Sequence, residues 1–320
     1  MFKALAGAAD KQEWEDHLMQ LYYHKSPAGN FGDDLSPWLF SLSIPEWRDV
    51  ADDDHCIFGV GTILTERTLA KFPKPIILGS GGTKKTVPSR SVLEKCDFIS
   101  VRGPLTRDML GLPHNILLGD PAIYIPRLLD PSTPCGGQKT AFVPHHLTLT
   151  GPMGGEIRRA VEQELDIKVI SPSQDFRMVV NHIRSASLVL TESLHGAIIA
   201  DTFRVPWCAV AFSPVFNSFK WLDWGRSVGI EPKVHTAFRL VNFASRWLGK
   251  LKRRLNMERD LGLDWREDKL FSRDRLCDEF VRVLRSAMGS GPMLSADSMV
   301  EERMDDFEKS IQEFRSRYKQ

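Results

Sequence analysis

The sequence lacks several features that would point to common classes of protein. Its five cysteines, Cys56, Cys96, Cys135, Cys208 and Cys277, show no CxxC spacing, which argues against a zinc site or a disulfide framework and favours reduced thiols. The net charge is only +1, so the composition gives no reason to expect a nucleic-acid partner. No apolar run approaches the ~18 residues of a membrane span. Residues 1–20 carry acidic side chains and no apolar stretch typical of a signal peptide. We therefore expect a soluble, cytoplasmic protein.

What the sequence does contain is a repeated alternation of short apolar runs and helical segments. The apolar runs that indicate strands lie near residues 21–24, 55–58, 75–78, 97–101 and 116–118, and again at 140–143, 168–170, 188–190 and 205–212. Residues 131–139, which contain two prolines and two glycines, separate the two series as a linker. The alternation predicts an α/β fold of two doubly wound, Rossmann-type domains that face a cleft. The predicted parts are an N-terminal arm (1–20), the two domains (21–130 and 140–230) and C-terminal helices (231–320).

Residues 187–200 place polar side chains directly after a predicted buried strand. Glu192, Ser193 and His195 follow the strand, and Gly196 opens a helical run. Ligands of open α/β sheets bind at the carboxyl ends of the strands, where the free N–H groups of the next helix favour anions. The turn is therefore either an anion site with a titratable histidine or an ordinary connection whose histidine caps the helix.

The predicted first domain has a comparable loop after its first strand. The loop contains Asn30 and Gly32 and ends in Asp33 and Asp34. One of the two carboxylates is expected to cap the helix that follows. A second carboxylate beside it favours a site, although a loop with a helix cap is the alternative.

Two glycine turns, residues 59–62 and 79–82, end the next two predicted strands and are expected to lead into helices. Glycines such as Gly81 and Gly82 leave backbone N–H groups free for a phosphate or carboxylate. Neither turn completes a GxGxxG or P-loop motif, so nicotinamide or ATP binding is not favoured. Arg102 ends a further strand, where a guanidinium can bind a carboxylate or phosphate. The alternative for Arg102 is a structural ion pair.

The C-terminal part differs in composition. Residues 236–255 combine apolar side chains at spacings of three and four with several basic residues and no acidic ones. Such a helix either contacts an anionic membrane surface or packs on the body of the protein. Residues 257–320 are charged and helical in pattern, with a break at 289–292, which suggests packing or oligomer contacts.

Six short motifs occur in a fixed order along the chain. They are residues 30–34 (Asn-Phe-Gly-Asp-Asp), 59–62 (Gly-Val-Gly-Thr), 79–82 (Gly-Ser-Gly-Gly), 101–103 (Val-Arg-Gly), 119–120 (Gly-Asp) and 192–196 (Glu-Ser-Leu-His-Gly). This ordered set resembles the polysaccharide pyruvyltransferase family, in particular the bacterial exopolysaccharide ketal-pyruvyltransferases of the succinoglycan type. The resemblance implies a GT-B-like fold with phosphoenolpyruvate as donor. The implied acceptor is a sugar of an exopolysaccharide or of its undecaprenyl-linked oligosaccharide precursor.

The resemblance also suggests roles for individual residues. Ketal formation from an enol phosphate needs a proton on the methylene carbon, deprotonated sugar hydroxyls and neutralised donor charge. We expect His195, with a pKa near neutrality, to deliver the proton. Deprotonation of the acceptor is assigned to Asp33, Asp34 or Glu192. The predicted binding residues are Arg102, Gly81, Gly82, Ser193 and Gly196 for the donor, and Asn30 and Gly32 for the acceptor.

One departure from the family pattern concerns the donor. Many members carry an arginine where this chain has Ser193, so Arg102 is the leading candidate to bind the donor's charge. The chemistry requires no metal or cofactor, and no ligand cluster with metal spacing is visible in the sequence.

Two other hypotheses remain open from the sequence. The first is a GT-B nucleotide-sugar glycosyltransferase, in which Glu192 would bind a ribose. The second is a non-catalytic scaffold at the membrane surface that uses residues 236–255, in which Ser193 would mark lost catalysis.

Overall fold

The computed structural model describes residues 21–26, 29–48, 54–129, 139–150, 153–212, 216–236 and 273–318. The predicted arm at 1–20, all but the last residue of the linker at 131–139, and all but the first residue of the basic segment at 236–255 lie outside these residues. Within the described ranges, no helix combines the length and the apolar character needed to cross a membrane.

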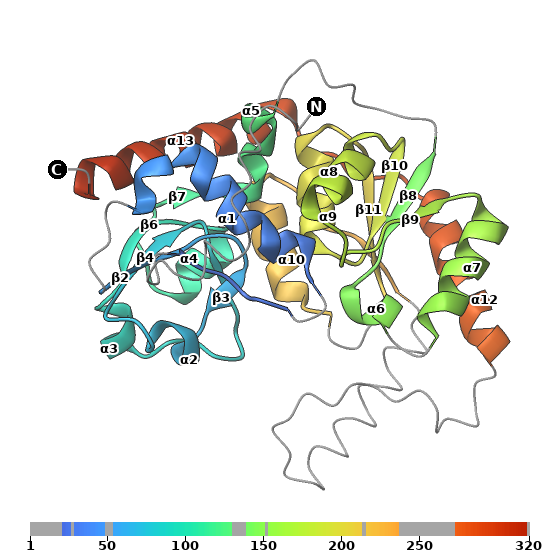
Figure 1. Ribbon diagram of the computed structural model, residues 1–320, viewed down its shortest axis with the longest axis horizontal. Coiled ribbons are helices and arrows are strands. Elements are labelled where there is room, and N and C mark those ends of the chain that lie inside the picture. The colour runs from blue at the N-terminus through green and yellow to red at the C-terminus, as the bar shows by residue number, and fades with distance from the viewer. Residues whose placement is uncertain are drawn as a thin grey trace, which may run out of the picture.

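The first domain is built on a five-stranded parallel sheet with the spatial order β1-β2-β4-β6-β7 (Figure 1). Its strands are β1 (Leu21–Tyr22), β2 (His55–Phe58), β4 (Lys74–Leu78), β6 (Asp97–Val101) and β7 (Leu117–Leu118). The last three residues of each of β2, β4 and β6 are buried, as continuous apolar runs predict for a parallel sheet that is covered on both faces.

The prediction that the two glycine turns lead straight into helices was wrong. The chain after them forms two short parallel strands instead, β3 (Thr62–Leu64) and β5 (Gly81–Gly82). Gly61 has a φ of +122°, which an L side chain rarely adopts, and its carbonyl accepts a 2.9 Å hydrogen bond from the N–H of Gly81. The two turns therefore lie side by side, and helix α2 (Glu66–Leu69) begins only after β3.

The other helical elements of this domain are short except for the first. They are α1 (Phe31–Ser43), η1 (Pro45–Arg48), α3 (Arg90–Leu93), α4 (Pro104–Met109), η2 (Pro121–Tyr124) and α5 (Ile125–Leu128). Pro104 occupies the first turn of α4, as predicted, because its missing N–H would have no helical partner there.

The second domain is also built on a five-stranded parallel sheet. Its parallel sheet has the order β12-β11-β10-β8-β9, with β8 (Thr140–Val143), β9 (Lys168–Val169), β10 (Leu188–Thr191), β11 (Trp207–Ala211) and β12 (Val234–Thr236). The helices between the strands are α6 (His146–Thr150), α7 (Gly154–Leu165), α8 (Phe176–Arg184), α9 (Leu194–Thr202) and α10 (Ser218–Ser227). The predicted fold class of two Rossmann-like domains is thus confirmed, while the exact domain boundaries remain a prediction.

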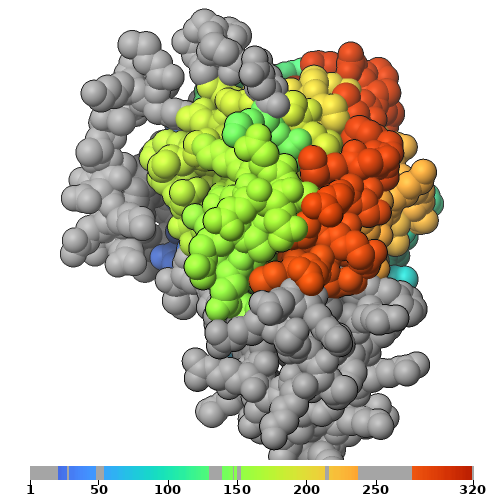
Figure 2. Space-filling view, turned by 90° about the vertical axis from the view of Figure 1, so that its right-hand side faces the viewer, coloured from blue at the N-terminus to red at the C-terminus, as the bar shows by residue number. Residues whose placement is uncertain are grey.

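Two C-terminal helices, α12 (Arg273–Met288) and α13 (Asp297–Tyr318), flank the predicted break at 289–292. Helix α12 lies beside α7 on the second domain (Figure 2). Helix α13 returns to the first domain and packs on β6, β7 and η2 (Figure 1). The hydroxyl of Tyr318 in α13 donates a 2.6 Å hydrogen bond to Asp97 of β6. Asp305 of α13 forms a 2.7 Å ion pair with Arg127 of α5.

One apolar core joins the two domains. It contains buried side chains of α1, of the C-terminal helix α13 that packs on the first domain, and of α8, α9 and β11 of the second domain. Direct contacts between α1 and α8, and between α9 and η2, lie in this region. The carboxyl ends of the two sheets are therefore held at a common interface, where ligand sites of open α/β sheets occur.

Candidate functional site

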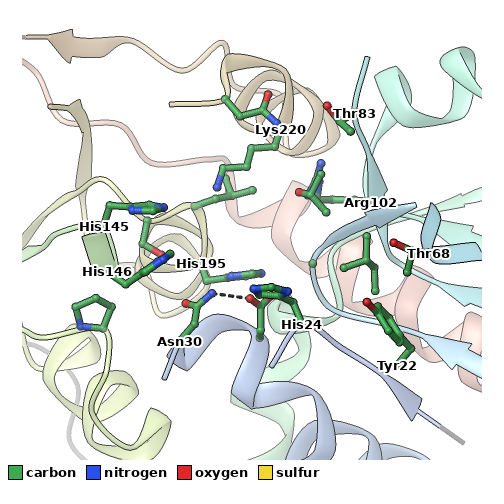
Figure 3. A pocket seen from close by; sticks show the side chains of 18 of the residues that line it. Tyr22, His24, Asn30, Thr68, Thr83, Arg102, His145, His146, His195 and Lys220 are labelled. Carbon is green, nitrogen blue, oxygen red and sulfur yellow. Dashed lines mark hydrogen bonds between the residues drawn. The ribbon is translucent and has the colours of Figure 1, made fainter. Parts of the chain in front are cut away.

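A cavity of about 390 Å³ opens between the two domains (Figure 3). The first domain lines it with residues that follow β1, β2, β5 and β6, and the second with residues that follow β8 and β10 and with α10. The lining side chains with hydrogen-bonding or charged groups are Tyr22, His24, Asn30, Asp33, Thr62, Thr68, Thr83, Arg102, His145, His146, Ser193, His195, Asn217 and Lys220. The structure thus brings together polar residues from the two sequence regions that were predicted to face each other.

Arg102 is held by a carboxylate that the sequence analysis did not identify. Its Nε donates to Oδ2 of Asp223 on α10 at 3.1 Å, and the two side chains are 1% and 0% exposed. Asp223 also accepts from the N–H and the hydroxyl of Thr106, at 2.8 and 2.6 Å. On the other side, Nη1 of Arg102 donates to the hydroxyl of Thr62 at 2.7 Å. Arg102 therefore forms the structural ion pair that was the alternative, and it also lines the cavity; its binding of an anion stays a prediction.

One nitrogen of Arg102 has unused bonding capacity. Its Nη2 is buried and has no hydrogen-bond partner among the described residues. Gly81, which we predicted to offer its N–H to the donor, instead lies against the guanidinium, where a Cβ would overlap it. A buried guanidinium with an unused N–H group is a strong site for a planar carboxylate or phosphate.

Lys220 is the second cation in the cavity, and the sequence analysis missed it. Helix α10 carries it one turn before Asp223, and its ammonium points into the cavity opposite Arg102 (Figure 3). Burial, followed by the charge of Arg102, lowers the pKa of Lys220 to about 8. The sequence signal for Lys220 was its position between two aromatic residues, Phe219 and Trp221, which are buried. A lysine between buried residues needs a polar cavity that can hold its ammonium group.

His195 lies in the first turn of α9, whose N-cap is Ser193. Gly32 packs against the ring, and a Cβ at that position would overlap Nδ1. The other ring nitrogen, Nε2, lies 3.8 Å from Oδ2 of Asp120. Burial, followed by the charges of Lys220 and Arg102, lowers the pKa of His195 to about 3. The pKa of His195 is therefore not near neutrality as we expected, because burial disfavours the charged ring and two nearby cations add to this effect.

The paired aspartates have different positions. Helix α1 begins at Phe31, before both of them, so neither Asp33 nor Asp34 takes the N-cap position that we predicted for one of them. Asp34 accepts from the backbone N–H of Asn30 at 3.0 Å and does not line the cavity. Asp33 lines the cavity and accepts from the side-chain amide of Asn30 at 2.5 Å (Figure 3). Burial raises the pKa of Asp33 to about 6.

Glu192 does not line the cavity. One carboxylate oxygen accepts from the N–H of His145 at 3.0 Å and from the hydroxyl of Thr148 at 2.7 Å, and the other accepts from the N–H of Phe212 at 2.9 Å. The side chain thereby ties the ends of β8, β10 and β11 together. Its geometry favours a structural role over the deprotonation that we predicted from the sequence.

The remaining predicted donor residues are largely used within the protein. The N–H of Gly196 donates to the hydroxyl of Ser193 at 3.4 Å, so this turn is a capped helix start. The N–H of Gly82 donates to Thr106 at 3.1 Å. Ser193 itself lines the cavity, whereas Gly82 and Gly196 lie behind it. The anion-binding capacity of this site therefore rests on side chains more than on backbone N–H groups.

Comparison with known proteins assigns the chain to a family. The sequence profile described as "Polysaccharide pyruvyl transferase" matches residues 6–214. The chain belongs to the polysaccharide pyruvyl transferase family. A relative named "Succinoglycan biosynthesis protein ExoV", from Rhizobium meliloti (strain 1021), is 32% identical over 94% of this chain and 100% of its own length. A solved structure of a functionally uncharacterised protein from Klebsiella pneumoniae matches 63% of this chain and 86% of its own, at 18% identity and a TM-score of 0.34.

In this member of the family, three further histidines line the cavity. They are His24, which follows β1, and His145 and His146, which follow β8 and whose rings lie 4.2 Å apart. Burial, followed by the charge of His146, lowers the pKa of His145 to about 3. The signal that could have found this pair is the one used for Arg102, polar residues directly after a strand. No group of three or more potential metal ligands occurs among the described residues.

Proposed function

We propose that this protein transfers pyruvate from phosphoenolpyruvate to a sugar of an exopolysaccharide, or of its lipid-linked oligosaccharide precursor, forming a ketal and releasing phosphate. The observation that carries the proposal is the meeting of Arg102, Lys220, His195 and Asp33 in one cavity of a chain that belongs to the polysaccharide pyruvyl transferase family. Phosphoenolpyruvate carries a phosphate and a carboxylate, which matches a site with two cations, Arg102 and Lys220.

The two cations bind the donor in this proposal. Nη2 of Arg102 and the ammonium of Lys220 take the phosphate and the carboxylate, and the hydroxyl of Thr62, which accepts from Arg102, keeps the guanidinium directed at them. Lys220 supplies the charge that the family resemblance expects from an arginine at Ser193. Charge-assisted hydrogen bonds of this kind are about twice as strong as neutral ones.

The chemical steps follow from the placement of the two titratable groups. His195 gives a proton to the methylene carbon of the donor, and a sugar hydroxyl attacks the resulting cationic carbon while Asp33 takes its proton. Loss of inorganic phosphate and attack by a second hydroxyl complete the ketal, and the proton of that second hydroxyl leaves with the phosphate. Asp33 suits the base role because its pKa of about 6 leaves it ionised and basic at neutral pH.

The histidine end of the cavity receives the acceptor in this proposal. The imidazoles of His24, His145 and His146 and the amide of Asn30 line the cavity, and groups of this kind suit the faces and hydroxyls of a sugar. The relative named as a succinoglycan biosynthesis protein supports an exopolysaccharide acceptor. We place the reaction in the cytoplasm, with residues 236–255 as a proposed contact to the membrane that carries a lipid-linked acceptor.

Mass spectrometry tests the proposal. The purified chain is incubated with phosphoenolpyruvate and candidate oligosaccharides, and the expected product has gained one pyruvyl group with loss of water. Thermal stabilisation by phosphoenolpyruvate should accompany this activity. Stabilisation by a uridine or guanosine diphosphate sugar, with no response to phosphoenolpyruvate, would instead support the glycosyltransferase hypothesis and overturn ours.

A further inference from the structure

Asp120 is a buried carboxylate that the proposed chemistry does not use. It follows β7, and its Oδ1 accepts a 3.1 Å hydrogen bond from the N–H of Ala122, which caps η2. Its other oxygen, Oδ2, is buried without a hydrogen-bond partner in the part of the chain that the structure describes. The side chain is 0% exposed. A buried carboxylate oxygen is costly to leave without a donor, so this atom requires an explanation.

The atom that Oδ2 faces is also without a partner. Nε2 of His195 lies 3.8 Å away and, among the described residues, is buried with nothing to bond. The two groups come from different domains, and they meet because α9 packs on η2. A hydrogen bond between Nε2 and Oδ2 needs a separation of about 2.8 Å. A movement of about 1 Å by either side chain would therefore form this bond.

We propose that Asp120 is the positioning residue of His195: in the donor complex its Oδ2 accepts a hydrogen bond from Nε2–H, which leaves the proton on Nδ1 for the methylene carbon of the donor. This inference rests on the proposed function for the identity of the donor. Gly32 is part of the arrangement, because a Cβ there would overlap Nδ1 and block that nitrogen. Asp120 acts only through the ring and does not itself touch the donor.

The surrounding charges explain why the pair forms with the donor bound. The charged groups around His195 are the cations Arg102 and Lys220 and the carboxylate Asp120. Behind them, Asp33 interacts with Lys220 and Asp120, and Asp223 pairs with Arg102. In the free protein burial, followed by the charges of Lys220 and Arg102, holds the imidazole neutral. A bound phosphate and carboxylate neutralise both cations, and the charge of Asp120 then favours the imidazolium. The donor therefore offsets the coulombic causes that disfavour the charged ring, and Asp120 stabilises the imidazolium that the reaction requires.

The first test is nuclear magnetic resonance of the full chain with 15N-labelled histidine. The His195 signals are assigned by their loss in His195→Gln. In the free wild-type protein we expect the Nε2–H tautomer, because Oδ2 of Asp120 is the acceptor beside that nitrogen. With saturating phosphoenolpyruvate and no acceptor sugar, we expect the ring to titrate at a higher pH than in the free protein. An Nδ1–H tautomer in the free wild-type protein would overturn the proposal. This outcome can be observed without any variant of Asp120.

The second test is Asp120→Asn. Asparagine keeps an oxygen for the cap of η2 and removes the charge beside His195. We expect the titration midpoint of His195 with phosphoenolpyruvate to fall by about 1 pH unit or more. The same variant should lose about 10-fold or more in kcat with a KM for phosphoenolpyruvate close to that of the wild type. An unchanged midpoint in a folded Asp120→Asn protein would refute the pairing.

Asp223→Asn is the matched control, because it removes another buried carboxylate of the same site that contacts Arg102 and not His195. It should raise the KM for phosphoenolpyruvate and leave the tautomer of His195 unchanged; a shifted tautomer would contradict a specific role of Asp120. The tautomer is measured without turnover. If it is Nε2–H and no sugar is pyruvylated, the proposed function fails while the pairing stands.

Discussion

Asp223 holds Arg102 from the opposite side of the domain interface, with 3.1 Å between Oδ2 and Nε and both side chains buried. The same helix, α10, carries Lys220 one turn earlier into the cavity. One element therefore fixes the first cation and supplies the second. The proposed donor end of the cavity depends on α10 being packed against α4, an arrangement that brings residues about 120 positions apart into contact.

The Arg102–Asp223 pair gives a prediction for both stability and binding. In Asp223→Asn the guanidinium remains buried without its counterion, so we expect a loss of about 3 kcal/mol in the free energy of unfolding. The KM for phosphoenolpyruvate should rise about 10-fold, because Arg102 is no longer fixed. Urea unfolding and steady-state kinetics check the two effects. A fully stable variant with an unchanged KM would show that Asp223 does not hold Arg102.

Direct removal of the two central groups should abolish most of the activity. We expect Arg102→Ala and His195→Ala each to lower turnover by about 100-fold or more, through lost charge stabilisation and lost proton transfer respectively. The assay is release of inorganic phosphate that depends on the acceptor sugar, with circular dichroism to check folding. Turnover near the wild-type level in either folded variant would exclude that residue from the mechanism.

The pH dependence of kcat/KM should be bell-shaped. Asp33 and Asp120 both have a pKa raised by burial to about 6, so the rate should rise as pH increases through that value and the carboxylates ionise. Lys220 has a pKa lowered by burial to about 8, so the rate should fall as it loses its proton above that value.

Lys220→Arg tests the alkaline limb of this profile. A guanidinium stays charged over the whole range, so the fall above pH 8 should disappear or move to higher pH. Lys84→Arg is the control, because Lys84 lies near α10, over the ring of Phe219, but does not line the cavity. An alkaline limb that stays in place in Lys220→Arg would assign it to another group.

Glu192 gives a prediction that separates structure from catalysis. Its two oxygens accept three hydrogen bonds inside the second domain. In Glu192→Gln one donor loses its acceptor, so we expect a loss of about 1–3 kcal/mol in stability. The kcat of the folded fraction should change little. A stable variant whose kcat falls about 100-fold would restore Glu192 as the base that deprotonates the acceptor.

Gly81→Ala should displace the side chain of Arg102. A Cβ at Gly81 would overlap the guanidinium, so the arginine must move from its position between Thr62 and Asp223. We expect the KM for phosphoenolpyruvate to rise about 10-fold. Gly155→Ala is the control, because a Cβ there meets no atom of the described residues within 4 Å. Equal kinetics in the two variants would contradict the role of Gly81.

The sequence by itself determined the fold class and several members of the site. Apolar runs and glycine punctuation specified the strands, and the rule that polar residues after parallel strands face a ligand selected Arg102 and His195. That rule works because all strands of a parallel sheet end at the same edge. The motifs also indicated the family, which the profile match over residues 6–214 confirmed.

Only the tertiary structure decided which of these residues line the cavity and which stabilise the fold. Lys220 and Asp223 lie on a helix, not directly after a strand, so no local pattern connects them with Arg102; only the packing of α10 on α4 does so. Glu192 and Asp34 have the right chemistry but lie outside the cavity, because nearby N–H groups bind their oxygens. The approach of Asp120 to His195 spans two domains. The sequence does not show which way a carboxylate points. Its burial and the hydrogen-bond donors around it, which depend on the tertiary structure, determine whether it stabilises the fold or faces a ligand.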